Sequence, residues 1–249
     1  MLLAGKLCVV TGAASPRGIG RATARALAGQ GARVAILDLD EEAARSTAAG
    51  IGSGHVGLAC DVTDRERCRA AVEWIVAEAG GVDVLVNNAG ITQPLGLMDI
   101  APGDYDAVLD VSLRGTLNMS QAVVPHMRAR RAGSIVCISS VSAQRGGGIF
   151  GGPHYSAAKA GVLGLMRAMA RELGPDGVRV NAVAPGLIDT DITAGKLTEA
   201  MRAEVLRGIP LGRIGLAAEV AGVCVFLASD LSAYVTGATI DVNGGMHIR

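Results

Sequence analysis

The stretch Leu7-Cys8-Val9-Val10-Thr11-Gly12-Ala13-Ala14-Ser15-Pro16-Arg17-Gly18-Ile19-Gly20 runs from an apolar segment through a glycine-rich turn into a helical pattern. Its glycines permit a tight turn and a close approach of the backbone to a ligand, and the N-terminus of the following helix favours a pyrophosphate. The position of this glycine-rich turn (residues 11–20), between a first strand and a first helix, is typical of dinucleotide-binding folds. Glycine-rich turns also serve packing alone, so this stretch by itself leaves both interpretations open.

The rest of the chain repeats this alternation of short β-branched runs and Ala-rich helical patterns. Strand-like runs lie at 7–11, 33–37, 56–60, 82–86, 134–139, 178–183 and 239–242, and helical patterns lie near 18–30, 41–50, 64–79, 103–131, 155–173 and 217–228. Apolar strands separated by helices predict an α/β fold with a parallel sheet covered on both faces. No linker or repeat interrupts the pattern, so we expect one domain over residues 1–249. The polar, glycine-punctuated segment at 190–210 is typical of a cover over a ligand.

Composition narrows the class of partner. The 249 residues carry 23 basic and 23 acidic side chains without a block of like charge, which argues against nucleic acid or an anionic membrane as the main partner. No uninterrupted run of roughly 18 apolar residues occurs, so we expect no membrane span. The five cysteines include no C-x-x-C pair, and they predict a reducing, cytoplasmic location.

Tyr155-Ser156-Ala157-Ala158-Lys159 places a phenol and an ammonium group one helical turn apart, where residues i and i+4 share a helix face. The chain has three tyrosines and only three lysines (Lys6, Lys159 and Lys196), while Arg supplies its other basic side chains. The pKa of a Lys responds to its surroundings, whereas Arg stays protonated. The pair therefore indicates chemistry at one site, and a contact on the helix surface is the structural alternative.

Asp38 follows the second strand-like run, eighteen residues after Gly20. An acid in this place hydrogen-bonds a ribose hydroxyl of a dinucleotide. The alternative is a helix N-cap, for which Asp38 or Asp40 would serve.

Five motifs now stand in order along the chain. They are the glycine-rich turn, Asn87-Asn88-Ala89-Gly90, Ser139-Ser140, Tyr155-x-x-x-Lys159 and Pro185-Gly186. With them the chain resembles the short-chain dehydrogenase/reductase family over essentially its whole length. The resemblance implies a single Rossmann-type doubly wound domain with a seven-stranded parallel sheet flanked by helices. It also implies NAD(P)-dependent interconversion of a carbonyl and a secondary alcohol.

The resemblance assigns the catalytic roles by position. It makes Tyr155 the general acid/base, and it makes Lys159 the group that lowers the tyrosine's pKa and holds the nicotinamide ribose. A cation within ~4–6 Å favours a phenolate, and an acid/base group works best when its pKa lies near the working pH. Ser140 would hydrogen-bond the substrate oxygen. Spacing to the tyrosine favours Ser142 instead, but the Ile138-Ser139-Ser140 context leads us to expect Ser140.

The resemblance also implies a cofactor-binding set. It comprises Gly12, Ser15, Arg17, Gly18, Ile19 and Gly20 of the glycine-rich turn, Asp38, then Asp61 and Val62 against the adenine, Asn88, Ala89 and Gly90, Tyr155 and Lys159, and Pro185, Gly186, Ile188 and Thr190 near the nicotinamide. His154, beside the tyrosine, is expected to be structural. Asp189 and Asp191 lack His or Cys partners, so we expect no metal site.

Two positions depart from the family pattern. The turn carries five residues between Gly12 and Gly18 where three are usual, and Pro16-Arg17 looks like the insertion. Ser112 stands where family members usually carry an Asn that bends the helix and holds a water in a proton relay to the lysine. A serine can bond a backbone carbonyl one turn back and can hold a water, but it lacks the paired donor and acceptor of an amide. We count Ser112 among the expected catalytic residues.

Cofactor choice depends on Asp38 and Arg17. A carboxylate at Asp38 accepts both ribose hydroxyls and repels a 2′-phosphate, whereas an Arg in the glycine-rich turn is associated with NADP-preferring relatives. Unit like charges at ~4 Å repel by ~4 kcal/mol at an effective dielectric constant near 20. We therefore expect NAD as the preferred cofactor, with NADP as the alternative.

These expectations combine into an NAD-dependent oxidoreductase that acts on a small-molecule secondary alcohol or ketone. Two alternatives remain open. One is an NADPH-dependent 3-oxoacyl-thioester (acyl carrier protein) reductase, and the other is a cofactor-binding protein without turnover. Apolar surface on the helices at 103–131 and 155–173, together with the resemblance, implies a homo-oligomer, namely a tetramer.

Overall fold

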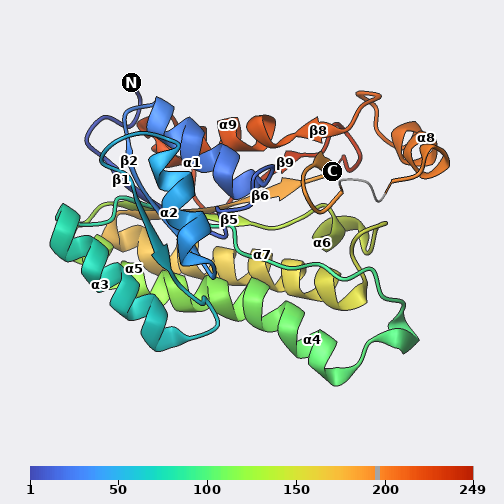
Figure 1. Cartoon of the computed structure of the whole chain (residues 1–249), viewed down its shortest axis with the longest axis horizontal. Helices are drawn as coiled ribbons and strands as arrows, with labels where there is room; N and C mark the ends of the chain where they lie inside the picture. The colour runs from blue at the N-terminus through green and yellow to red at the C-terminus, as the bar shows by residue number, and fades with distance from the viewer. Residues whose placement is uncertain (194–196, 249) are drawn as a thin grey trace.

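A computed structural model describes residues 1–193 and 197–248 of the chain, and its seven-stranded sheet has the strand order β3-β2-β1-β4-β5-β6-β9 (Figure 1). The strands are β1 (Leu7–Thr11), β2 (Arg33–Asp38), β3 (Val56–Ala59), β4 (Val84–Asn87), β5 (Gly133–Ile138), β6 (Val178–Pro185) and β9 (Thr239–Val242). All six neighbouring pairs are parallel. The predicted doubly wound parallel sheet is confirmed, and the predicted strand bounds agree within two residues.

The strands are apolar on both faces because each face is covered by helices. Successive residues of β1 alternate between two cores: Leu7 and Val9 belong to one, and Cys8 and Val10 belong to the other. This is the period of two expected of a strand whose side chains point alternately up and down. A strand buried on both sides reads as an uninterrupted apolar run, which is why the sequence pattern identified it.

Two groups of helices cover the sheet, one on each face (Figure 1). The helices α1 (Ile19–Gly29), α2 (Glu41–Ala49) and α9 (Ala217–Ala228) pack on one face, and α3 (Arg65–Ala79), α5 (Gly115–Arg130) and α7 (Pro153–Leu173) pack on the other. The buried residues of each core therefore pack against the helices of one group only. Within the described residues no helix is both long enough and apolar enough to span a bilayer.

The long helical pattern at 103–131 is three consecutive pieces rather than one uniform helix. They are α4 (Pro102–Leu109), a π-helical turn (Asp110–Arg114) and α5. A π-helical turn inside a helix is rare and frequently lies at a functional site. Ser112 lies in the middle of it.

Four short elements follow the carboxyl ends of the strands. They are α6 (Ser142–Arg145), β7 (Ile188–Asp189), α8 (Glu199–Arg207) and β8 (Gly215–Leu216). The predicted cover at 190–210 contains α8, which Figure 1 shows set apart from the sheet. Positions 194–196 of that segment lie outside the described residues.

Candidate active site

A cleft of about 610 Å³ opens at the carboxyl ends of β1, β4, β5 and β6. Ligands of open parallel sheets bind at this edge, where the strand order reverses. The predicted site residues that line the cleft are Gly12, Ser15, Gly18, Ile19, Asn88, Gly90, Ser140, Tyr155, Lys159, Pro185, Gly186, Ile188 and Thr190. The predicted residues that do not line it are Arg17, Gly20, Asp38, Asp61, Val62, Ala89 and Ser112.

Tyr155 and Lys159 lie on the first two turns of α7, and Ser140 follows the end of β5. The Lys159 ammonium lies 5.8 Å from the centre of the Tyr155 ring, and its Nζ donates to the Ile138 carbonyl at 2.9 Å. The Ser140 side chain lies close enough to the Tyr155 phenol to lower its pKa. Strand and helix thus bring a hydroxyl, a phenol and an ammonium group to one wall of the cleft.

Burial is the largest influence on both titratable groups. Desolvation raises the pKa of Tyr155, and the hydrogen bond to Ser140 opposes that rise. Desolvation also lowers the pKa of Lys159 from 10.5 to about 8. The Lys159 ammonium donates to the Ile138 carbonyl in this arrangement, and burial raises the pKa of Tyr155. The lowering of the Tyr155 pKa by Lys159 stays a prediction.

The neighbouring serines have different partners. Ser139 Oγ donates to the Lys159 carbonyl at 2.9 Å, so it ties β5 to α7. Ser140 Oγ accepts from the Ser142 backbone N–H at 3.1 Å. Ser140 is the serine that lowers the pKa of the Tyr155 phenol, and both Ser140 and Ser142 line the cleft.

Ser112 is wholly buried, and its Oγ makes no hydrogen bond within the described residues. A Cβ built on Gly90 would lie 3.4 Å from this Oγ and 3.0 Å from Lys159 Nζ. The serine and the lysine therefore border the same small space beside Gly90. The π-helical turn forms without a bond from the Ser112 hydroxyl to the carbonyl one turn back. That type of bond is made instead by Thr116, whose Oγ1 donates to the Ser112 carbonyl at 2.8 Å.

The outer glycines of the glycine-rich turn are required by packing between β1 and β4. Gly12 has φ 61°, and a Cβ there would lie 2.8 Å from Ala89 Cα. A Cβ on Gly20 would lie 2.5 Å from Asn88 Nδ2, which donates to the Thr11 and Gly12 carbonyls at 2.9 and 2.8 Å. Asn88 therefore joins the ends of the two strands, in addition to lining the cleft.

Two acids that follow β6 bind the inserted part of the glycine-rich turn. Asp191 accepts from the Ser15 hydroxyl and, at 2.9 Å, from the Arg17 backbone N–H. These bonds lower the pKa of the Asp191 carboxyl, the Ser15 bond having the larger effect. Arg17 Nη2 lies 2.5 Å from Asp189 Oδ1. The turn thus already binds two carboxylates, those of Asp191 and Asp189.

Asp38 lies on the opposite side of β1 from these acids. Its carboxylate accepts from the Ala14 N–H at 2.9 Å and from the Leu39 N–H at 2.8 Å. The N-cap of α2 is Asp40, whose Oδ1 accepts from the Ala43 N–H at 3.0 Å. Asp38 is thus not the helix cap, and two backbone bonds hold its carboxylate at the end of β2.

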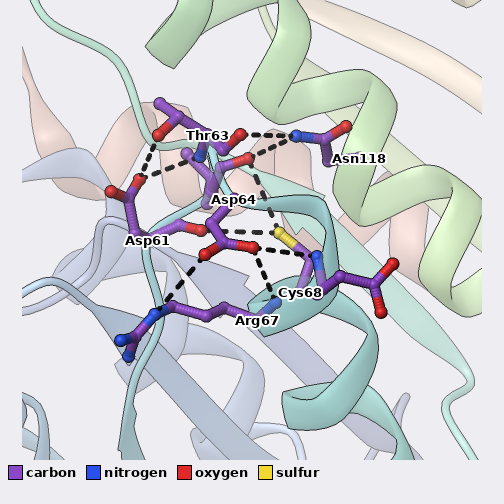
Figure 2. Close-up of polar contacts among 8 residues, drawn as sticks. Asp61, Thr63, Asp64, Arg67, Cys68 and Asn118 are labelled. Atoms are coloured by element: carbon purple, nitrogen blue, oxygen red, sulfur yellow. Dashed lines mark hydrogen bonds and ion pairs between the residues drawn. The ribbon is translucent and has the colours of Figure 1, made fainter.

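Asp61 and Val62 begin the turn between β3 and α3, which Figure 2 shows. Asp61 Oδ1 accepts from the backbone N–H and the hydroxyl of Thr63 at 2.9 and 2.7 Å. Asn118 of α5 reaches this turn from 56 residues away and donates to the Val62 carbonyl at 2.9 Å. Asn118 was not among the predicted site residues, because other polar side chains of the same helix, such as Thr116, Ser120 and Gln121, leave it without a distinguishing signal in the sequence.

Two further polar residues hydrogen-bond the segment that follows β4 and borders the cleft. Thr11 Oγ1 accepts from the Asn88 and Ala89 N–H groups, both at 3.0 Å. His154 is buried, and its Nε2 lies 2.9 Å from Gln93 Oε1. The histidine thus joins the start of α7 to the loop after β4.

Comparisons with known proteins agree with this geometry. A family model described as enoyl-(acyl carrier protein) reductase matches residues 12–247. An uncharacterized short-chain type dehydrogenase/reductase of Sinorhizobium fredii, y4mP, is 58% identical over 253 aligned positions, with both chains fully covered. The 3-oxoacyl-[acyl-carrier-protein] reductase FabG of Thermotoga maritima is 46% identical, again with both chains fully covered.

A solved structure of another protein has the same fold. The crystal structure of a short-chain type dehydrogenase/reductase from Mycobacterium marinum superposes with a TM-score of 0.92 at 33% identity, covering 99% of this chain and 97% of that one. With the family model, the relatives and the strand-edge cleft in agreement, the chain belongs to the short-chain dehydrogenase/reductase family of nicotinamide-dependent oxidoreductases.

Proposed function

We propose that the chain transfers a hydride between NAD(H) and a secondary alcohol or ketone, with Tyr155 as the general acid/base. The observation that carries this proposal is the shared wall of Ser140, Tyr155 and Lys159 in the cleft. The reacting oxygen of the substrate lies between the Ser140 and Tyr155 hydroxyls. In alcohol oxidation the Tyr155 oxygen takes up the hydroxyl proton, and in ketone reduction it returns it.

The residues of the cleft fit a nicotinamide dinucleotide. The N-terminus of α1 has no side-chain cap and no acid in its first turn, so its N–H groups suit a phosphate. The turn before it binds the Asp191 carboxylate through Ser15 and Arg17, which supports anion binding there. Tyr155 and Lys159 would hold the nicotinamide half, and the bound nicotinamide supplies or accepts the hydride.

Lys159 and Ser112 would form a path along which protons pass to and from Tyr155. A lysine with a pKa of about 8 exists in both protonation states near neutral pH, so it is suited to proton exchange. Its Nζ and the Ser112 Oγ border one buried space beside Gly90, and a small polar molecule there would bond both. We propose Ser112 in place of the family's Asn at this step.

NAD is the proposed cofactor, and two contacts support this choice. The Asp38 carboxylate is held at the end of β2, where it would accept bonds from ribose hydroxyls and repel a 2′-phosphate. Arg17, the cation that would attract such a phosphate, is paired with Asp189 on the β6 side. Comparing kcat/KM for NAD and NADP tests the choice, and a tenfold preference for NADP would contradict it.

The decisive experiment is an oxidation screen followed by a single substitution. NAD reduction is followed with a panel of sugar alcohols, hydroxy acids, cyclic alcohols and hydroxyacyl thioesters. Tyr155→Phe keeps the ring and removes the acid/base group, so it should abolish whichever activity the screen finds. Substantial residual turnover in Tyr155→Phe would refute the assigned acid/base, and no turnover by the wild type would favour a cofactor-binding protein.

A second candidate is a 3-oxoacyl-thioester reductase using NADPH. Its support is the 46% identity to the Thermotoga maritima FabG across both full chains. Reduction of a 3-oxoacyl thioester with NADPH, at a higher kcat/KM than any alcohol in the screen reaches with NAD, would favour this candidate.

The proposal includes a cytoplasmic homotetramer. The five cysteines are buried free thiols, as expected in a reducing compartment. Sedimentation equilibrium of the purified chain tests the oligomeric state.

A further inference from the structure

The turn between β3 and α3 is held by an unusually complete set of local hydrogen bonds (Figure 2). Asp61 Oδ1 accepts two bonds from Thr63, while its Oδ2 accepts none from the described residues. Asp64 caps α3 by accepting from the Glu66 and Arg67 N–H groups at 2.9 and 3.1 Å. The turn therefore has a defined shape and leaves one carboxylate oxygen of Asp61 available to a ligand.

A second helix anchors the same turn from a distance. Asn118 of α5 is 6% exposed, and its Nδ2 donates to two successive carbonyls, those of Val62 at 2.9 Å and Thr63 at 3.2 Å. Gly115 lies one turn earlier on α5, and a Cβ there would lie 2.6 Å from Val62 Cγ2. One face of α5 thus presents an amide to the carbonyls of the turn and a glycine to the Val62 side chain.

The position of this turn in the sheet indicates which half of a dinucleotide it meets. Tyr155, Lys159 and Ser140 lie on the β4-β5-β6 side of β1, and Asp38 lies on the β2-β3 side. A dinucleotide bound at the strand-order reversal extends to both sides of β1, with its pyrophosphate at the start of α1. Because hydride transfer takes place on the first side, the adenosine half lies on the second, over the ends of β2 and β3.

We propose that Asn118 is a positioning residue for the adenosine half of the cofactor. Its two bonds hold the backbone of Val62 and Thr63, and Thr63 in turn orients the Asp61 carboxylate. Removing the amide frees both carbonyls and lets the turn shift away from the bound adenine. This inference rests on the proposed function, since it requires that the chain bind an adenine dinucleotide.

The test uses ADP-ribose, which carries the adenosine half and lacks the nicotinamide. Its binding is measured by isothermal titration calorimetry on the wild type, on Asn118→Leu, and on Gln121→Leu as a control at an exposed position of the same helix. Asn118→Leu should raise the Kd of ADP-ribose about tenfold, equivalent to about 1.4 kcal/mol. The Gln121→Leu value should match the wild type. In steady-state kinetics the KM for NAD should rise in parallel while kcat is retained, a split that a general loss of structure would not produce.

A second variant tests the position of the same turn without removing a polar group. Gly115→Ala places a methyl group against Val62, while alanine favours the helix over glycine by about 1 kcal/mol. It should also weaken ADP-ribose binding, because it displaces the turn that Asn118 holds. A folded Gly115→Ala that binds ADP-ribose as tightly as the wild type would overturn the role of Asn118, which acts only through the position of this turn.

The outcomes separate the two proposals. A wild type that fails to bind ADP-ribose would refute cofactor binding itself. A wild type that binds, together with folded Asn118→Leu that binds equally well, would refute only the role of Asn118. A parallel loss of kcat and of ADP-ribose affinity would also overturn it, because the residue would then support the whole site rather than its adenosine half.

Discussion

Replacing Lys159 by Met should stabilise the fold at neutral pH, although the lysine is proposed to be essential for catalysis. The Lys159 side chain is 4% exposed, and among the residues that the structure describes its Nζ bonds the Ile138 carbonyl alone. Burial lowers its pKa from 10.5 to about 8. A depressed lysine pKa means that the folded state holds the ammonium less favourably than water does.

The pH dependence follows from the two pKa values. Below about pH 8 both folded and unfolded chains carry the proton, and the folded chain bears the full cost of the buried charge. Between about pH 8 and 10.5 the folded chain releases the proton while the unfolded chain keeps it, so stability rises with pH. The gap between the two values corresponds to about 3 kcal/mol at about 1.4 kcal/mol per pH unit.

Methionine removes this cost and also the bond to the Ile138 carbonyl, whose loss offsets about 1 kcal/mol. The net expectation at pH 7 is a gain of about 2 kcal/mol in the free energy of unfolding, shrinking towards zero by about pH 10. A buried charge that lowers stability is common where catalysis requires a group that is unfavourable for the stability of the fold.

Urea denaturation of wild type, Lys159→Met and Lys6→Met at pH 7 and pH 10 measures the effect. Lys6 lies outside the cleft at a partly exposed position, so Lys6→Met controls for the change in net charge. A Lys159→Met variant less stable than wild type at pH 7 would refute the reasoning. A stabilisation of equal size at both pH values would also refute it, because the gain would then come from packing rather than from the charge.

Three further changes are predicted. Asp38→Asn should narrow the kcat/KM preference for NAD over NADP at least tenfold, because it removes a charge that would repel a 2′-phosphate by up to about 4 kcal/mol; Asp40→Asn, which removes the neighbouring charge and keeps a side-chain cap on α2, should leave the ratio unchanged. Gly90→Ala should lower kcat more than tenfold in stopped-flow hydride transfer, because its Cβ would lie 3.0 Å from Lys159 Nζ; unaltered kcat would show that this space is not used. Asp191→Asn should lower the Kd of NAD several-fold in calorimetry, because it removes a carboxylate from donors that a phosphate would use; weaker binding would mean that the acid assists the cofactor.

The sequence by itself determined the sheet, because its signals are local. A strand buried on both faces is apolar almost throughout, so β1 could be read from a short run of residues. The spacing of Tyr155 and Lys159 predicts a shared helix face, since one turn of helix separates them. The placement of the site at the carboxyl ends of the strands follows from the same alternation.

Other features depend on pairs of residues that only folding brings together. The Arg17 side chain pairs with Asp189, 172 positions away, and Asn118 reaches a turn 56 positions before it. No periodicity encodes such pairs, because they depend on how separate strands and helices pack side by side.

The tertiary structure also determines the pKa values of the titratable groups in the site. The resemblance implied a phenol whose pKa is lowered by Lys159, whereas in the folded chain burial raises the pKa of Tyr155 and the ammonium donates to the Ile138 carbonyl. Spacing along a helix defines which groups are neighbours. The pKa of each group depends on the water that the surrounding fold removes from it, and therefore only the packed structure determines it.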